Sequence, residues 1–125
     1  MPLVKLHVAS GVYDQARLDK ISNAVHGALV EILKVPQNDY FVVISEMPDG
    51  HFYHPPTFLG HTYTKEFMVL EITFGVGRPV DTHEILLKEL NQRIVSEANV
   101  SPDDMFILLY YIPLNYVSSV GASPV

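Results

Sequence analysis

A proline directly after the initiator methionine is the residue of this sequence with the clearest chemical potential. Removal of Met1 is efficient before a small second residue, and we expect it to leave Pro2 as an N-terminal secondary amine. A free α-amino group has a pKa of about 8, and burial in an apolar pocket lowers that pKa because the cation loses its hydration. Such an amine can act as a general acid or base near neutral pH. Proline is also tolerated at this position in many proteins without any role. Whether Pro2 is functional must therefore be judged from the rest of the sequence.

The composition is that of a globular domain and narrows the possible partners. The chain has 125 residues, 48% of them apolar, which suffices for one domain with a core. A net charge of −6 argues against a nucleic-acid partner, because phosphate binding needs a basic surface. The lack of cysteine excludes thiolate catalysis and Cys-based metal sites. With no signal-peptide pattern and no apolar run near the roughly 18 residues of a membrane span, we expect a cytoplasmic protein without a membrane partner.

The chain carries one pattern twice, with an offset of 65 residues. The offset pairs Asp39 with Asp104, and it also brings several apolar residues together: Val4 with Val69, Ile21 with Leu86, Val25 with Leu90, Leu29 with Ile94, and Phe41 with Phe106. We therefore predict a single domain over residues 1–125, with half-chains 2–48 and 67–113, a linking loop over 49–66 and a tail over 114–125.

Each half predicts a strand, a helix and a second strand. In the first half, Asp14 can cap a helix whose apolar residues recur three and four positions apart and which has ended by Pro36. The remaining elements are predicted as strands Leu3 to Val8, Tyr40 to Ser45 (a buried strand), Phe67 to Phe74 and Met105 to Ile112, and a helix from Val80 to Ala98. Right-handed crossovers make the two strands of each half parallel neighbours. The predicted fold class is α/β (α+β), a four-stranded sheet with two helices on one face and pseudo-twofold symmetry.

Both faces of the predicted sheet are apolar. Phe41, Phe106 and Leu108 have one parity along their strands, whereas Ile44 and Leu109 have the other. Two helices cover only one face of a sheet, so we expect another subunit to cover the second face.

These features together resemble the tautomerase superfamily, which includes 4-oxalocrotonate tautomerase, macrophage migration inhibitory factor and malonate semialdehyde decarboxylase. The resemblance covers nearly the whole chain and is strongest with the decarboxylase branch. It depends on the order and spacing of five short motifs: Met1-Pro2-Leu3-Val4, Val35-Pro36-Gln37-Asn38-Asp39-Tyr40, Glu46-Met47-Pro48, Leu59-Gly60 and Gly77-Arg78-Pro79. It implies a homotrimer in which Pro2 is the catalytic group, and no cofactor is expected because an amine and an arginine suffice.

The resemblance also assigns roles to three further residues. Arg78 matches a family arginine that holds a substrate carboxylate and stabilises charge on an enolate oxygen; otherwise it is a solvated residue at a helix start. Asp39 matches an aspartate that orients water or substrate, but its repeat partner Asp104 makes a plain turn residue equally possible. Tyr116 replaces a family tryptophan as a pocket wall that binds substrate.

The implied function is keto–enol tautomerisation of a small 2-oxo or enol carboxylic acid. An alternative is decarboxylation or hydration of a 3-oxo or unsaturated acid, but Val76 stands where the decarboxylase branch has a second arginine. A second alternative is a non-catalytic binding protein on the same fold. The changed segment after the last strand, Asn115 to Ser119, favours this alternative somewhat, and an attached Met1 would favour it strongly.

The loop over residues 49–66 contains His51, His54 and His61. Imidazole suits zinc, but these histidines have no fixed face and no carboxylate or cysteine at a diagnostic spacing, so we expect no metal site. We expect the loop to cover the pocket instead, with an apolar wall formed by Phe52, Tyr53 and Phe58.

Overall fold

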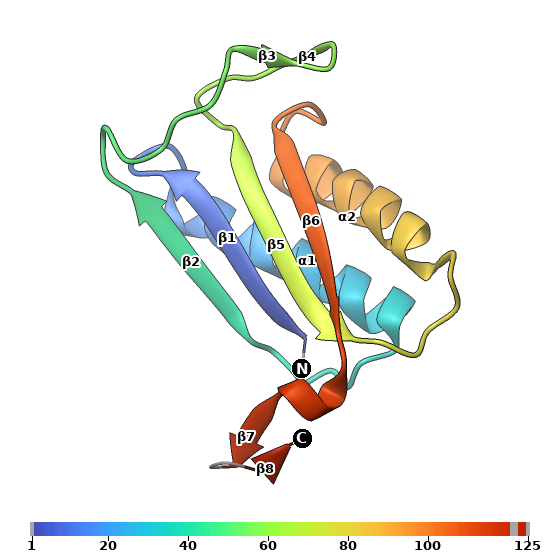
Figure 1. The fold of residues 1–125 in the computed structure, drawn as a ribbon. Helices are drawn as coiled ribbons and strands as arrows, with labels where there is room; N and C mark the ends of the chain where they lie inside the picture. The colour runs from blue at the N-terminus through green and yellow to red at the C-terminus, as the bar shows by residue number, and fades with distance from the viewer. Residues whose placement is uncertain (1, 121–122, 125) are drawn as a thin grey trace.

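A four-stranded sheet with two helices on one face and an open second face forms the body of the protein (Figure 1). This arrangement comes from a computed structural model that describes residues 2–120 and 123–124. The strand order is β2-β1-β5-β6. The elements are β1 (Leu3–Ala9), α1 (Gln15–Leu33), β2 (Val42–Met47), β5 (Met68–Gly75), α2 (Thr82–Ala98) and β6 (Met105–Ile112). The predicted fold class is confirmed.

The pairing of the strands gives the sheet two distinct ends. β1 is parallel to β2, and β5 is parallel to β6. β1 and β5 pair antiparallel in the centre, where Leu6 lies opposite Leu70. The starts of β1 and β2 therefore share one end of the sheet with the ends of β5 and β6, and we call this the Pro2 end. The opposite end, where β2 leads through the linking loop to β5, is called the hairpin end.

The two helices show how far the repeat extends. The carboxylate of Asp14 accepts a hydrogen bond from the Arg17 amide at 2.8 Å and caps α1, as predicted. α2 begins at Thr82 rather than Val80, whose side chain is 86% exposed and contributes nothing to a buried helix face. Both helices end on a left-handed residue, Lys34 and Asn99, and these two lie 65 positions apart.

The hydrophobic core lies between the helices and the inner face of the sheet. Alternate residues of the two central strands point into it, and the predicted apolar stripes of the helices meet them. The fully buried side chains include Leu6, Val8, Met68, Leu70, Ile72 and Phe74 from the strands and Ile21, Val25, Leu29, Leu86, Leu90 and Ile94 from the helices.

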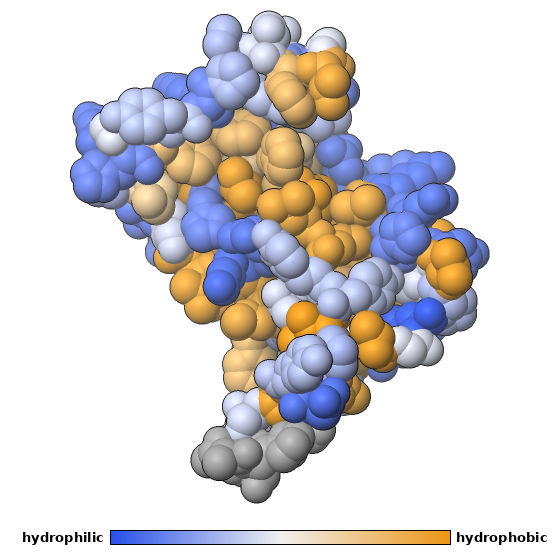
Figure 2. Space-filling model, in the orientation of Figure 1, coloured by the Kyte–Doolittle hydropathy of each residue, from blue (hydrophilic) through white to orange (hydrophobic). Residues whose placement is uncertain are grey.

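The outer face of the sheet remains open in the single chain. Figure 2 shows hydrophobic side chains gathered over it. The exposed large side chains of its strands and of the segment before β2 include Phe41, Val43, Phe106, Leu108 and Tyr110. β2 is an edge strand with Val43 51% exposed, so the prediction of a buried strand from Tyr40 is wrong. The outward side chains of this apolar run lie on the open face of the sheet, which the single chain does not cover.

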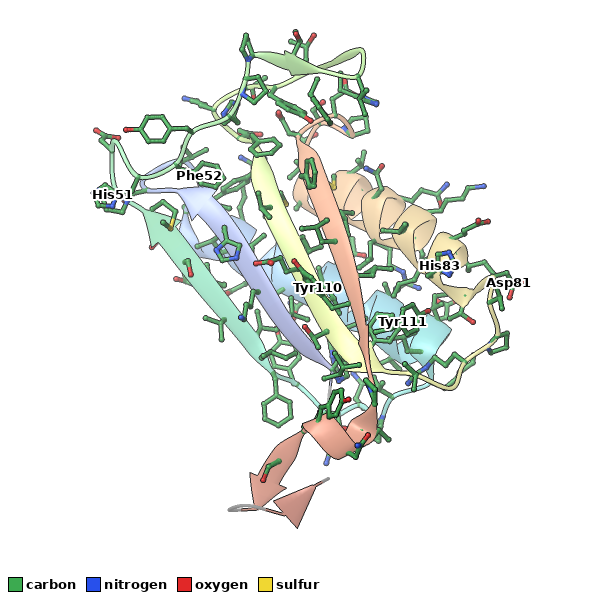
Figure 3. All side chains as sticks on the ribbon, viewed as in Figure 1. His51, Phe52, Asp81, His83, Tyr110 and Tyr111 are labelled. Atoms are coloured by element: carbon green, nitrogen blue, oxygen red, sulfur yellow. The ribbon has the colours of Figure 1, made fainter. Side chains whose placement is uncertain are left out.

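One polar network interrupts the open face. Glu71 on β5 binds His7 Nε2 at 2.6 Å and accepts a hydrogen bond from the Tyr110 hydroxyl at 2.9 Å. The bond to His7, followed by that from Tyr110, lowers the pKa of Glu71 below its ordinary value. Tyr110 lies over the sheet in Figure 3. Both carboxylate oxygens thus have a partner within the chain.

The linking loop and the tail contain short elements that were not predicted. A hairpin of β3 (Thr57–Phe58) and β4 (His61–Thr62) lies at the hairpin end, whereas a 3₁₀ turn, η1 (Leu114–Tyr116), lies at the Pro2 end (Figure 1). Two further short strands, β7 (Ser118–Val120) and β8 (Ser123–Pro124), follow η1. Across the described residues, no helix is both long and apolar enough to cross a membrane.

Candidate active site

Pro2 is buried at the start of β1, where it shares a shallow hollow with Asp39. Leu3 pairs with Thr73, so Pro2 lies beside the last residues of β5. The hollow is lined by Pro2 and Val4 from the first strand, by His26 and Leu29 from α1, and by Asp39, Tyr40, Phe41 and Val42 from the segment that enters β2. The structure thus brings Pro2 and Asp39 together. Met1 lies outside the described residues, and its removal stays a prediction.

Asp39 and its repeat partner occupy equivalent turns but differ in their surroundings. The amide of Asp39 binds the carbonyl of Pro36 at 3.0 Å, and that of Asp104 binds Ser101 at 3.0 Å. Asp104 is 1% exposed, and its carboxylate accepts hydrogen bonds from the amide and hydroxyl of Thr64 at 2.8 and 2.6 Å. Asp39 is instead half-buried at the hollow. Asp104 therefore anchors the linking loop, and only Asp39 faces a candidate site.

His26 is a site residue that the sequence analysis missed. Its Nε2 lies 2.7 Å from the carbonyl oxygen of Gln37, and a carbonyl only accepts, so Nε2 must carry the proton. Its Nδ1 is buried without a hydrogen-bond partner among the described residues. The ring packs edge-on against Tyr40, with the centroids 4.6 Å apart. Its repeat partner Asn91 donates to the carbonyl of Pro102 in the same way, at 3.0 Å, so this contact is common to both halves.

Arg78 lies at the Pro2 end but does not line the hollow. Its Nε and Nη2 each donate to the carbonyl of Leu33 at 3.2 Å, and its Nη1 donates to that of Gly75 at 3.1 Å. The guanidinium also lies 5.6 Å from the centre of the Phe74 ring. Arg78 is thus half-buried against the end of α1, where a cation is favourable, rather than solvated at a helix start. These bonds use three of the five N–H groups of a guanidinium.

Tyr116 also lies at the Pro2 end and outside the hollow. Its side chain is 77% exposed on η1. A Cβ at Gly75 would lie 2.7 Å from Cδ2 of Leu114, so the lack of a side chain at Gly75 lets η1 approach the end of β5. Arg78 and Tyr116 therefore both lie at the Pro2 end of the sheet, and neither lines the hollow.

The linking loop does not cover this hollow, which corrects the expectation from the sequence. The loop lies at the hairpin end, and Tyr53 and Phe58 form walls of a different cavity (Figure 1). The three histidines also separate. His61 Nδ1 binds Asp103 at 2.9 Å, His54 packs against Phe67, and His51 sits beside Phe52 at the start of the loop (Figure 3).

Comparison with known proteins agrees with this geometry. One family model described as "Tautomerase enzyme" matches residues 39–116, and a second with the same description matches residues 2–61. The chain belongs to the tautomerase family. The probable tautomerases YusQ and YrdN of Bacillus subtilis (strain 168) are similar to it. YusQ is 32% identical over 109 residues, which cover 87% of this tautomerase-family chain and 85% of the relative, and YrdN is 31% identical over 107 residues, with 86% and 81% covered.

Solved structures support the tautomerase fold. A crystal structure of malonate semialdehyde decarboxylase superposes with a TM-score of 0.84 at 24% identity and covers 94% of this chain and 90% of its own. A fused 4-OT described as a symmetric trimer superposes with a TM-score of 0.73 at 18% identity, with 97% and 93% covered. The fold is therefore that of the tautomerase family.

Proposed function

We propose that this chain is a tautomerase that uses the N-terminal nitrogen of Pro2 to interconvert the keto and enol forms of a small 2-oxo carboxylic acid. The observation that carries the proposal is the burial of Pro2 in a hollow that Asp39 and His26 also line. A buried amine that shares its hollow with two polar side chains is suited to proton transfer. Membership of the tautomerase family supports the same chemistry.

The proposed reaction moves one proton and needs no cofactor. The Pro2 nitrogen first removes the hydroxyl proton of the enol. The C=C electron pair then removes the proton from the Pro2 ammonium, so that a C–H bond forms at C3 and the oxygen on C2 becomes the 2-oxo group. Nearby hydrogen-bond donors stabilise the negative charge that develops on the substrate oxygen during proton transfer. In this proposal Arg78 binds the carboxylate of the substrate. Asp39 orients Pro2 or a water molecule, and Tyr116 forms a wall of the pocket.

Assembly is part of the proposal. In the single chain the hollow is too shallow to hold a water molecule, and neither Arg78 nor Tyr116 lines it. The open apolar face of the sheet calls for a cover, and the fused 4-OT with this fold is a trimer. We propose a homotrimer in which a neighbouring subunit contributes residues around Pro2 and so completes a pocket for the substrate.

The test begins with the intact mass of the purified chain, which must show loss of Met1. Ketonisation of phenylenolpyruvate is then followed by ultraviolet absorbance for the parent chain and for Pro2→Ala, with Pro48→Ala at the hairpin end as the matched control. We expect Pro2→Ala to lower kcat/KM by about 100-fold or more, since acid–base groups contribute roughly 10²–10⁴. Pro48→Ala should leave kcat/KM unchanged.

Two results would overturn the proposal. One is full activity in Pro2→Ala, and the other is full activity in a chain that retains Met1, since the Pro2 nitrogen is then a non-basic amide. A parallel assay with malonate semialdehyde tests the decarboxylase alternative, which Val76 makes less favourable. Turnover of that acid with none of the enol would replace tautomerisation by decarboxylation, and turnover of neither would leave a binding protein.

A further inference from the structure

Asp39 lies in a turn whose internal shape is fixed by its own backbone. The turn comprises residues 36–40, and we call it the Asp39 turn. The amide of Asp39 donates to the carbonyl of Pro36, and the amide of Tyr40 donates to that of Asn38, both at 3.0 Å. Asp39 is therefore the last residue of one tight turn and the central residue of another. These two bonds set the shape of the turn but not its place on the body of the protein.

The side chain of His26 supplies two contacts between the Asp39 turn and α1. Its Nε2 donates to the carbonyl of Gln37 at 2.7 Å, and its ring packs edge-on against Tyr40, with the centroids 4.6 Å apart. Gln37 precedes Asp39 by two residues and Tyr40 follows it, so the two contacts lie on both sides of the aspartate along the chain. Because α1 also lines the Pro2 hollow, a turn that is held to α1 keeps its place at the hollow.

The first strand holds the chain on the other side of the Asp39 turn. The amide of Val4 donates to the carbonyl of Phe41 at 2.9 Å, which fixes the segment after the turn relative to β1. Pro2 directly precedes β1. The strand thus fixes the exit of the turn close to Pro2, and His26 fixes the body of the turn against the helix.

The second half of the chain repeats the two contacts around Asp104. Asn91, the repeat partner of His26, donates from its Nδ2 to the carbonyl of Pro102 at 3.0 Å and also lies 3.6 Å from Sδ of Met105. These two residues lie 65 positions after the two that His26 contacts. The same helix position therefore holds an aspartate turn in each half, although the residue types differ. In the first half, the turn that is held in this way lines the Pro2 hollow.

From these contacts we infer that His26 is a positioning residue, which holds the Asp39 turn against α1 and so sets the position of the Asp39 carboxylate relative to Pro2. The inference rests on the proposed function, in which Asp39 orients Pro2 or a water molecule. His26 acts through Asp39 and not on the substrate itself. A misplacement of about 1 Å can lower a rate about 100-fold, so the loss of either contact should be measurable.

The experiment is a double-mutant cycle on the full-length chain, with ketonisation of phenylenolpyruvate as the measurement. His26→Asn keeps a donor for Gln37 but loses the ring, and we expect it to lower kcat/KM about tenfold, against about 100-fold for Asp39→Ala. Since His26 acts through Asp39, the double variant should lose the same 100-fold or so as Asp39→Ala alone. Two independent effects would instead multiply to about 1,000-fold.

Two further variants separate positioning from a general loss of structure. His26→Ala loses both contacts and should lower kcat/KM more than His26→Asn does, but no more than Asp39→Ala does. Asn91→Ala removes the corresponding contacts at the hairpin end and is the matched control, which should leave kcat/KM unchanged. Unfolding midpoints in urea show that each variant is folded under the conditions of the assay.

Three results would overturn the inference: a loss of about 1,000-fold in the double variant, parent kinetics in His26→Ala, or a loss in Asn91→Ala as large as that in His26→Ala. Pro2→Ala distinguishes this failure from that of the proposed function. Full activity in Pro2→Ala overturns the proposed function and the inference with it. Loss of activity in Pro2→Ala, together with multiplying effects of His26 and Asp39, overturns the inference alone.

Discussion

The two ends of the sheet are built from the same repeat and differ in their polar side chains. At the Pro2 end, Asp39 in the turn before β2 lines a hollow together with His26, whose Nδ1 is buried without a hydrogen-bond partner among the described residues. At the hairpin end, the corresponding turn buries Asp104 in hydrogen bonds to Thr64, and Asn91 replaces the histidine. The backbone geometry is retained, since both turns and both helix ends match. A few side chains therefore distinguish the end with the Pro2 hollow from the end where Asp104 holds the linking loop.

The largest effect is expected at Asp39. Replacement by alanine removes the carboxylate from the Pro2 hollow, and we expect kcat/KM for phenylenolpyruvate to fall about 100-fold. The unfolding midpoint in urea should change little, because the turn is held by the backbone bond to Pro36. An unchanged kcat/KM would return Asp39 to the role of a plain turn residue.

The matching change at the hairpin end should affect stability instead. Asp104→Ala leaves the amide and hydroxyl of Thr64 without a buried acceptor, and we expect a loss of about 2 kcal/mol in the free energy of unfolding. Urea denaturation measures this loss, and phenylenolpyruvate turnover of the folded variant should persist. A variant as stable as the parent would show that the tether of the loop is not needed.

A smaller effect is expected when His26 is changed to the residue of its repeat partner. In His26→Asn, the side-chain amide can still donate to Gln37, as Asn91 does to Pro102, so the fold should be kept. The ring contact with Tyr40 and the acceptor Nδ1 are lost. We expect kcat/KM to fall about tenfold, in line with the roughly 1–3 kcal/mol at stake for an unpaired polar group. Equal kinetics in variant and parent would remove His26 from the site.

The smallest effect concerns pH and the Glu66 tether at the hairpin end. Hydrogen bonds from Arg17 hold the pKa of Glu66 below its ordinary value of 4.5. The stabilisation is therefore present above about pH 4.5 and is lost as the pH falls through the lower folded-state pKa of Glu66. Urea midpoints measured at pH 6 and pH 3 should differ less in Glu66→Gln than in the parent. Identical differences would mean that this pair contributes nothing to acid stability.

The sequence was sufficient to predict the main helices and strands, because their periodicity records burial. The stripe through Ile21, Val25 and Leu29 is buried as predicted. Tyr40 and Phe41 misled the prediction of β2, because an apolar run looks the same whether it forms a strand or walls a hollow. The position of the linking loop could have been deduced, since a loop from the end of β2 to the start of β5 must lie opposite the start of β1.

The candidate site was harder to predict than the fold. Pro2 and Asp39 were found through the family motif, and the structure places them in one hollow. His26 was missed, because its nearness to the site depends on where the Gln37 turn folds against α1. The direction of Arg78 depends on the carbonyl at the end of α1, a backbone group whose position no sequence pattern reports.

The covalent link between the halves has an evolutionary consequence. Because β1 and β5 pair antiparallel about the pseudo-twofold axis, two separate identical half-length chains could build the same sheet as an isologous dimer. In such a dimer, every substitution at one end would also appear at the other. Fusion into one chain makes each end a separate target of selection, so one can keep its amine while the other gathers rings.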